Sequence, residues 1–451
     1  MSALVLVAGS LSRPAPLAAG PDSEVASAFD PGDPYDIHVS LDYQVTSRRS
    51  AIRRELTGAP GADPEGPMPL VKDLVFAGTR HELVPRVEIG VFTDLALTLA
   101  LPVVVRDSRR LEFDQRADSC DFAPNPRDAT CIDASNSTTV ASGLLPEGGF
   151  DAGDPGGDGG GDAFRGVNRS GLDQLHVGVV WAPLNQERDA SKPTWKAGSE
   201  LRLSLGDVMA YDGDDPSGET GVSRGFHELR LFTSMARRVG WAEPTFEIWW
   251  LTPLSTRRGA PLDDLDRNFG SGRTASQQRA GGRFGVEATA WKSRTGPARV
   301  AIQLGGELEA LFEGRAYTDM WEVFAHAGHA PTTGPLILDA DPVAQGRQAI
   351  SHPGVSSVEN YLTGAVRLGV DAAVTDLVRV DAGFRLGWEQ SHLISFAGAG
   401  QDSADDENEV VDPLSEEVNP FHVPLIDGPG HRYRVDDAAT YALSLGVRVL
   451  F

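Results

Sequence analysis

Apolar residues alternate with polar or small residues in twelve segments of the chain, each about nine to thirteen residues long. In the segment TYALSLGVRVLF, for example, Leu443, Leu445 and Val447 share one face, and Ser444 and Arg448 lie on the other. A period of two is that of a β-strand, whose successive side chains point to opposite faces. We therefore predict twelve strands, which cover residues 35–45, 83–92, 95–105, 172–181, 195–205, 227–235, 245–254, 283–291, 300–312, 362–372, 378–389 and 440–451.

The connections between these segments alternate strictly between short and long. The connections after every even-numbered segment are short, down to the pair Thr93 and Asp94, whereas the others contain from about twenty to more than sixty residues. A bacterial outer-membrane barrel has this rhythm, because its periplasmic turns are short and its external loops are long. We predict large external loops near 48–79, 107–170, 206–224, 255–278, 313–357 and 395–437.

The predicted fold is therefore all-β: a twelve-stranded antiparallel transmembrane β-barrel with both chain termini on the periplasmic side. Backbone groups in lipid must all be hydrogen-bonded, so such a sheet has to close on itself, with its apolar faces toward lipid and its polar faces toward the lumen. A soluble β-sandwich is not expected to alternate strictly between short and long connections. A lipocalin-like barrel would reverse the faces, but it uses a shorter chain and smaller loops. A membrane helix is excluded, because no apolar run reaches about eighteen residues.

Tryptophans fall near both ends of the predicted strands, where interfacial aromatic residues of a membrane barrel are expected. Ordinary packing residues are the alternative interpretation. The four near the short connections are Trp181, Trp195, Trp241 and Trp291, and the two near the long loops are Trp250 and Trp388.

The ending YALSLGVRVLF has a C-terminal Phe451, alternating apolar residues before it, and Tyr441 ten positions upstream. It resembles the terminal strand of Gram-negative outer-membrane barrels, which implies recognition by the barrel-assembly machinery. The stretch PRVEIGVFTDLALTLALPVVV looks like a strand–turn–strand segment of the meta-pathway phenol-degradation transporter group, and GLDQLHVGVVWAPLN is similar to another strand of that group. The group is mostly undefined in function, so this second resemblance implies the fold more than the activity.

The composition and the N-terminal residues indicate in which cellular compartment the protein works. The net charge is −24, which argues against nucleic acid as a partner, and Gly and Pro number 50 and 30, as suits many turns and loops. Only two cysteines occur, Cys120 and Cys131, and we predict a local disulfide and an oxidising compartment. An apolar stretch at residues 3–9 followed by APLAAG indicates a signal peptide over residues 1–28, although the missing basic stretch leaves open a truncated or misassigned start. Residues 29–451 would then form a single barrel domain.

Charged residues at lumenal positions are the candidate functional residues, and the two signs nearly balance among them. This balance leaves two readings open: a narrow water-filled pore lined by charges of both signs, or an interior that salt bridges fill. The predicted lumen-lining residues are Asp42, Arg86, Glu88, Lys196, Glu200, Arg202, Glu228, Arg230, Glu247, Arg283, Glu287, Glu307, Glu309, Arg367, Asp371, Arg379, Asp381, Arg385, Glu389 and Arg448.

The external loops are acidic and rich in glycine. In DAGDPGGDGGGD the carboxylates of Asp151, Asp154, Asp158 and Asp162 offer oxygen ligands for calcium, but the spacing is not that of an EF-hand, and solvated loops are the simpler interpretation. We expect no metal and no cofactor. His326 and His329 have metal-ligand spacing but no third ligand nearby in the sequence.

We expect an outer-membrane channel or facilitator for passive uptake of small solutes, with selectivity from the mixed-charge lumen and from loops 107–170 and 313–357 folding inward. Its other partners would be outer-membrane lipid and lipopolysaccharide. The alternative is a closed structural or adhesive barrel. A hydrolase is a distant third: the spacing of His38 and Ser40 is similar to that of the outer-membrane phospholipase family, whose pair faces lipid, whereas these two positions face the lumen.

Overall fold

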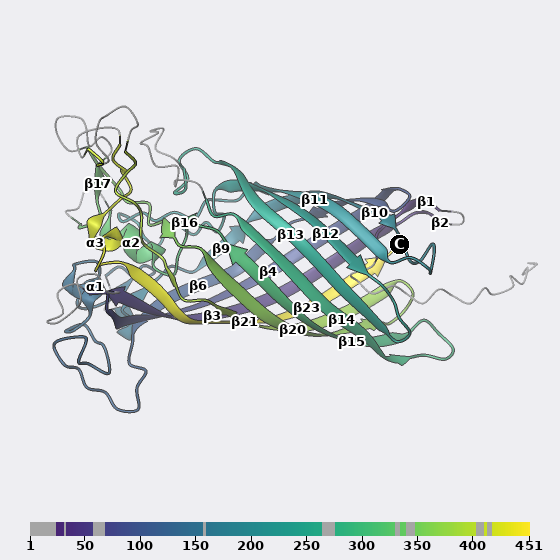
Figure 1. The fold of residues 1–451 in the computed structure, drawn as a ribbon, viewed down its shortest axis with the longest axis horizontal. Helices are drawn as coiled ribbons and strands as arrows, with labels where there is room; N and C mark the ends of the chain where they lie inside the picture. Colours follow the sequence, from purple (N-terminus) through teal and green to yellow (C-terminus); the bar gives the residue numbers. More distant parts are fainter. Residues whose placement is uncertain are drawn as a thin grey trace, which may run out of the picture.

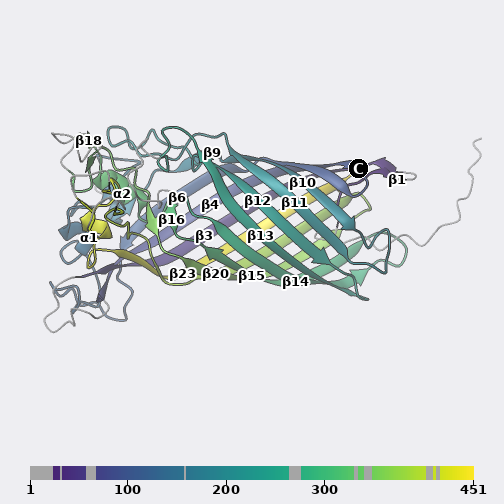
Figure 2. The ribbon, with the colours of Figure 1, turned by 45° about the horizontal axis from the view of Figure 1, so that its top comes forward.

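The computed structural model describes residues 24–30, 33–56, 68–156, 159–263, 276–329, 334–339, 348–402, 410–412 and 417–451. The chain forms a cylinder of tilted antiparallel strands (Figure 1). Loops and short helices gather at one end of this cylinder, and tight turns and the C-terminus lie at the other (Figure 1). A view turned by 45° shows the same arrangement (Figure 2).

Twelve strands close into a barrel. The last strand pairs with the first from Tyr433 and Arg54 to Leu450 and His38, so the sheet has no free edge. The third strand is interrupted at Pro102, which has no N–H to donate. The barrel strands are β3 (Ile37–Glu55), β4 (Leu70–Phe92), β5 (Leu95–Ala100) continued by β6 (Val103–Phe113), β9 (Arg169–Leu172) continued by β10 (Gln174–Leu184), β11 (Thr194–Ser204), β12 (Phe226–Ala236), β13 (Ala242–Thr256), β14 (Arg279–Lys292), β15 (Arg299–Leu311), β20 (Tyr361–Ala373), β21 (Val378–Glu389) and β23 (Tyr433–Leu450).

Each of the twelve predicted segments overlaps one barrel strand, so the predicted fold class is confirmed. The predicted loop near 48–79 is wrong in its bounds, because β3 continues to Glu55 and β4 begins at Leu70. The alternation of apolar residues stops earlier than the strands do, since these outer parts of β3 and β4 face the loops at the external end rather than lipid. For the same reason β6 reaches Phe113 and β23 begins at Tyr433, inside the loops predicted near 107–170 and 395–437.

The outer wall of the barrel is apolar. Leu304, Leu445 and Phe284 point away from the lumen and are 56%, 56% and 59% exposed, and similar side chains surround the barrel. A continuous apolar belt on a closed barrel is the surface of a bacterial outer-membrane protein, whose backbone groups are all paired before it meets lipid. Trp181, Trp195, Trp241, Trp291, Trp250 and Trp388 are all exposed on this surface.

The long loops pack together at the external end, and we call this body the external cap. It consists of the described residues within 114–168, 312–360 and 390–432. On α2 (Trp321–Ala327), Val323 and Phe324 are fully buried with Met320 and pack in one cluster with Ile52 and Leu74 of the barrel. None of the described helices is long and apolar enough to cross a membrane. The remaining elements at this end are α1 (Thr138–Ala141), β7 (Phe150–Asp151), the 3-10 turn Gly159–Gly161, β8 (Phe164–Arg165), β16 (Gly314–Ala316), β17 (Leu338–Asp339), β18 (Ala349–Ile350), β19 (Ser356–Val358), β22 (His392–Leu393) and α3 (Pro424–Asp427).

The start of the described chain lies at the opposite, periplasmic end. Residues 24–36, which we call the N-terminal segment, contain the hairpin of β1 (Ala28–Asp30) and β2 (Asp33–Tyr35). Val25 and Ala26 are buried against Ala96 and Ala182 of the wall. Residues 24–28, which the sequence assigned to a signal peptide, therefore pack with the barrel, and residues 1–23 lie outside the described part of the chain.

Candidate functional site

A cavity of about 630 Å³ occupies the barrel interior, and charged side chains dominate its wall. Eight Arg or Lys residues and six carboxylates line it, so the near balance predicted from the sequence becomes an excess of two positive charges. The basic residues are Arg86, Lys196, Arg202, Arg230, Arg279, Arg283, Arg367 and Arg448. The acidic residues are Glu24, Asp42, Glu88, Glu200, Glu247 and Glu309.

Most of the cavity carboxylates are held by a basic neighbour. Glu200 accepts from Nε of Arg202 at 2.8 Å, and Glu247 accepts from Nη2 of Arg230 at 2.6 Å. Glu309 lies 3.8 Å from Arg279. By contrast, Arg86 and Arg283 have no ion pair within 4 Å among the described residues. The cavity therefore offers cationic groups to a solute more readily than it offers anionic ones.

A second cavity of about 250 Å³ lies along β14, β15, β20 and β21, where glycines replace side chains on the lumenal face. Gly285 pairs directly with Gly305, and Gly369 pairs with Gly383. A Cβ added at Gly305 would lie 2.8 Å from the backbone oxygen of Phe284, so a larger residue does not fit there without movement. These glycines widen the lumen on one side.

The structure gathers the predicted lumen residues around these spaces. Twelve of the twenty line the large cavity, Glu287, Asp381 and Arg385 line the second one, and Glu389 lines a third under the external cap. The remaining four are in ion pairs: Glu228 with Arg224 and Arg279, Glu307 with Arg385, Asp371 with Arg299, and Arg379 with Glu24.

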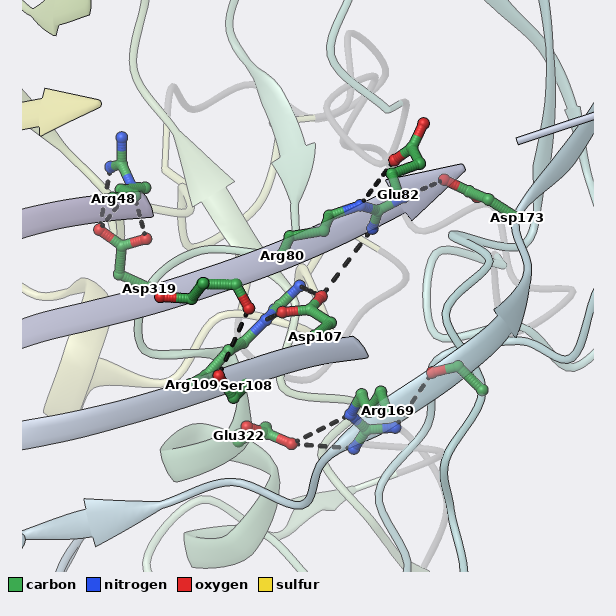
Figure 3. Close-up of polar contacts among 12 residues, drawn as sticks. Arg48, Arg80, Glu82, Asp107, Ser108, Arg109, Arg169, Asp173, Asp319 and Glu322 are labelled. Atoms are coloured by element: carbon green, nitrogen blue, oxygen red, sulfur yellow. Dashed lines mark hydrogen bonds and ion pairs between the residues drawn. The ribbon is translucent and has the colours of Figure 1, made fainter. Parts of the chain in front are cut away.

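The external cap is tied to the barrel by arginine–carboxylate contacts (Figure 3). Asp319 precedes α2 and accepts hydrogen bonds from Arg48 of β3, and Ser50 donates to the same carboxylate at 2.6 Å. Glu322 on α2 accepts from Nη2 of Arg169 at 2.8 Å, and both side chains are almost fully buried. Because α2 belongs to residues 313–357, this loop folds inward over the barrel mouth.

A cavity of about 310 Å³ lies beneath the external cap. Its wall includes Arg48 and Asp319, and the stacked rings of Tyr361 and His392, whose centroids are 3.6 Å apart. Further contacts at this level join Arg80 to Asp173 at 2.8 Å and Asp107 to Arg109 at 3.0 Å (Figure 3).

The external cap holds titratable groups in defined states. Burial opposes the charge of Asp319, but the Arg48 guanidinium and the hydrogen bonds from Arg48 and Ser50 outweigh it and hold the pKa of this carboxyl below its usual range. Burial lowers the pKa of His326 to about 4, and burial with the nearby charge of Arg315 lowers that of His352 to about 3. Both imidazoles are therefore neutral in the closed external cap at pH 7.

At the periplasmic end, Glu24 reaches from the N-terminal segment to two lumenal arginines. Its carboxylate accepts from Nη1 and Nη2 of Arg379 at 2.8 and 3.0 Å, and it lies 4.0 Å from Nη1 of Arg448. This is a forked, two-bond contact to an almost fully buried guanidinium. One carboxylate of the cavity thus belongs to the N-terminal segment rather than to a barrel strand.

The acidic loops contribute little that resembles a metal site. Asp151 and Asp162 both approach Arg165, Asp158 lies outside the described residues, and Asp154 joins no ligand group among those described. Asp212, Asp214 and His329 do place ligand atoms within 4.8 Å of one another. However, Nδ1 of His329 accepts the Gly213 N–H at 3.3 Å, so the neutral ring carries its proton on Nε2, the atom nearest Asp214.

The structure pairs Cys120 with Cys131 in a disulfide. His38 and Ser40 both line the large cavity, and Ser40 donates to Asp42 at 3.4 Å rather than to a histidine. A Ser–His pair of the kind a hydrolase needs is thus not formed among the described residues at this position.

Sequence reasoning missed several residues that line the barrel interior or contact it at the two mouths. Arg279 stands two lumenal positions before the predicted segment 283–291, so extending the alternation backward would have found it. Asp319 and Glu322 lie in a loop without periodicity, where nothing in the sequence indicates which barrel residue they meet. Glu24 was assigned to the signal peptide.

Comparisons with known proteins give fold-level likenesses only. No protein family model and no curated protein matches the sequence. An outer-membrane channel from Pseudomonas putida F1 aligns with 94% of this chain and 99% of its own, at 11% identity and a TM-score of 0.37. A FadL homologue of Pseudomonas aeruginosa covers 92% and 90%, at 8% identity and a TM-score of 0.31. The outer-membrane protease OmpT of Escherichia coli covers 92% and 97%, at 9% identity and a TM-score of 0.30. Values this low do not assign a function.

Proposed function

We propose that the protein is an outer-membrane channel for passive passage of small hydrophilic solutes, with the external cap as its gate. The observation that carries this proposal is the charged cavity of about 630 Å³ inside the barrel. A barrel that serves only as a scaffold can fill its interior with its own side chains. Here the charges stand around open space, which at ~30 Å³ for each water holds on the order of 20 waters.

The external cap closes this path and has contacts that suit a movable body. Its apolar core includes barrel residues such as Ile52 and Leu74, so the part we propose to move is α2, which two separate ion pairs join to the wall. Asp319 contacts Arg48, and Glu322 contacts Arg169, each across long stretches of sequence. Displacing α2 would break these pairs without changing a single pairing within the barrel sheet.

Reversible tethering of the external cap tests the proposal. Ser50→Cys and Asp319→Cys place thiols where Oγ and Oδ2 are now 2.6 Å apart. A short bifunctional methanethiosulfonate reagent should bridge them, and a planar bilayer containing the bridged protein should carry no current. Reduction should restore single-channel steps.

Two controls complete this experiment. The wild-type protein treated with the same reductant separates the tether from the native Cys120–Cys131 disulfide, and the Ser50→Cys variant alone shows the effect of the reagent. Silence of the double variant before and after reduction, together with silence of the wild type, would contradict a channel and favour the closed display barrel.

A further inference from the structure

We propose that the channel prefers solutes carrying a carboxylate, and that Glu24 occupies the periplasmic site at which such a carboxylate binds. This inference rests on the proposed channel function and names the solute class for it. Three observations carry it: the forked contact of Glu24 with Arg379, the excess of positive charge around the large cavity, and the availability of two of its arginines.

The contact between Glu24 and Arg379 has the geometry of carboxylate recognition. Two parallel N–H groups of one guanidinium meet the two oxygens of one carboxylate, at 2.8 and 3.0 Å. Arg448 adds a second positive charge 4.0 Å away. A buried guanidinium costs free energy unless an anion meets it, so this position in the wall calls for a carboxylate. The carboxylate that forms this two-bond contact with Arg379 belongs to the N-terminal segment and not to a barrel strand.

The large cavity next to this site is lined by positively charged side chains. Arg86 and Arg283 have no ion-pair partner within 4 Å among the described residues, and Nε of Arg283 is buried without a hydrogen bond. The carboxylates nearby are less available: Glu200 and Glu247 are bound to arginines, and Glu88 accepts the Ala26 N–H at 2.7 Å. An anion entering the cavity would find open donors at Arg86 and Arg283, and a cation would find most acceptors occupied, with Asp42 as the exception.

The acidic external loops do not reverse this preference. Charges exposed to solvent are screened over ~8 Å at physiological ionic strength. The cavity charges act on a solute at contact distance inside a low-dielectric wall, where their field is focused. We therefore expect the lumen, rather than the loops, to set the sign of selectivity.

Glu24 would then compete with solute carboxylates for Arg379 and Arg448, while it stays attached to the barrel through the N-terminal segment. A solute carboxylate can take its place on Arg379 and Arg448 only if the N-terminal segment gives up this contact. Removing the charge in Glu24→Gln should weaken its contact with Arg379 and let free carboxylates compete for this guanidinium. Asp30→Asn is the matched control, because Asp30 stands on the same segment but pairs with Arg188 of a periplasmic turn at 2.8 Å.

Ion selectivity in planar bilayers tests the preference. Under a KCl gradient at pH 7 the reversal potential should lie nearer the equilibrium potential of chloride than that of potassium. It should shift further toward the chloride value in Glu24→Gln but not in Asp30→Asn. Succinate added on the periplasmic side should block the current of Glu24→Gln at roughly tenfold lower concentration than that of the wild type, because one charge-assisted contact is no longer contested. Arg283→Gln should move the reversal potential toward the potassium side.

The outcomes separate this inference from the channel itself. A conducting wild type with a reversal potential on the potassium side would overturn the carboxylate preference and leave the channel standing. Equal succinate block in Glu24→Gln and Asp30→Asn would overturn the role of Glu24. Silence of all variants, including Asp319→Asn with its external cap contact removed, would overturn the channel and this inference with it. Heat-dependent gel mobility checks that each variant forms a barrel.

Discussion

Nε and Nη2 of Arg48 donate to the carboxylate of Asp319 at 3.1 and 2.9 Å, across 271 positions of sequence. Arg48 also pairs with Glu389, so one guanidinium on β3 joins the external cap to two places on the wall. Because Asp319 stands two residues before Trp321, the first residue of α2, this contact fixes where that helix begins to cover the lumen. If the external cap gates the barrel as we propose, this contact is where its closure can be altered most directly.

Asp319→Asn should raise the open probability of the channel. The substitution keeps the size of the side chain but removes the charge that faces Arg48, and a hydrogen bond to a charged group contributes about 1.5 to 3 kcal/mol. Single-channel recording measures the change. Asp154→Asn is the control, because it removes the same charge from an exposed side chain that has no ion pair among the described residues. Equal open probability in the two variants would show that Arg48 and Asp319 do not hold the external cap.

Arg169→Ala should destabilise the external cap more strongly than the barrel. Arg169 and Glu322 are 1% and 7% exposed, and the guanidinium also donates to the carbonyls of Glu219 and Ala210. Removing it leaves Glu322 buried without its countercharge, which costs about 3 to 5 kcal/mol. Limited proteolysis should cut within the external cap, while the barrel band persists. Arg169→Lys should rescue only in part, since one ammonium cannot reach all these acceptors. Unchanged protease resistance would contradict this role.

Acidification from pH 7 to pH 4.5 should favour displacement of the external cap. The pKa of His326 is lowered to about 4 and that of His352 to about 3, whereas a solvated imidazole has a pKa near 6.5. The displaced state therefore binds more protons at these two imidazoles as the pH drops below about 6.5, which lowers the stability of the closed external cap. Asp427, whose pKa burial raises to about 6, opposes this effect, but the two histidines outweigh the single carboxyl. Asp319 stays charged through this window, because Arg48 and Ser50 hold its pKa below the usual range of a carboxyl.

Open probability recorded at pH 7, 5.5 and 4.5 measures this effect. His326→Gln should reduce the dependence, since it keeps a polar group facing the Tyr211 hydroxyl, which lies 2.7 Å from Nδ1, but takes up no proton. A current that falls on acidification, or an identical pH dependence in the variant, would contradict the assignment to His326.

Deletion of Phe451 should lower the amount of assembled barrel in cells with little effect on the folded protein in detergent. Phe451 donates its N–H to the Ile37 oxygen at 2.9 Å and is 64% exposed, while the other pairings between β23 and β3 remain. Its proposed role is recognition by the assembly machinery rather than packing. Heat-modifiable protein in membrane fractions and the melting temperature after refolding in detergent measure the two quantities. Phe312→Ala, which removes another exposed aromatic ring, is the control. Equal losses from the two changes would contradict a signal at Phe451.

The faces of the strands could be predicted from the sequence because a period of two is a local property. Leu203 and Arg202 are neighbours in the chain, and in any paired strand they must point to opposite sides. Once one side meets lipid, the other has to be the lumen, and residues such as Arg86, Glu200 and Arg230 follow at once. The same argument fails for Arg279 only because the predicted segment began four residues too late.

What the sequence by itself determined is the closed barrel, the alternation of lipid-facing and lumen-facing residues, and which loops are long, because each of these depends on spacing along the chain. The tertiary structure decided the rest: that Asp319 and Glu322 meet Arg48 and Arg169, and that Glu24 reaches Arg379. These pairs join residues separated by 153 to 355 positions, and no local period encodes them. They form only when the barrel has closed and has brought the loops and the N-terminal segment to its two mouths.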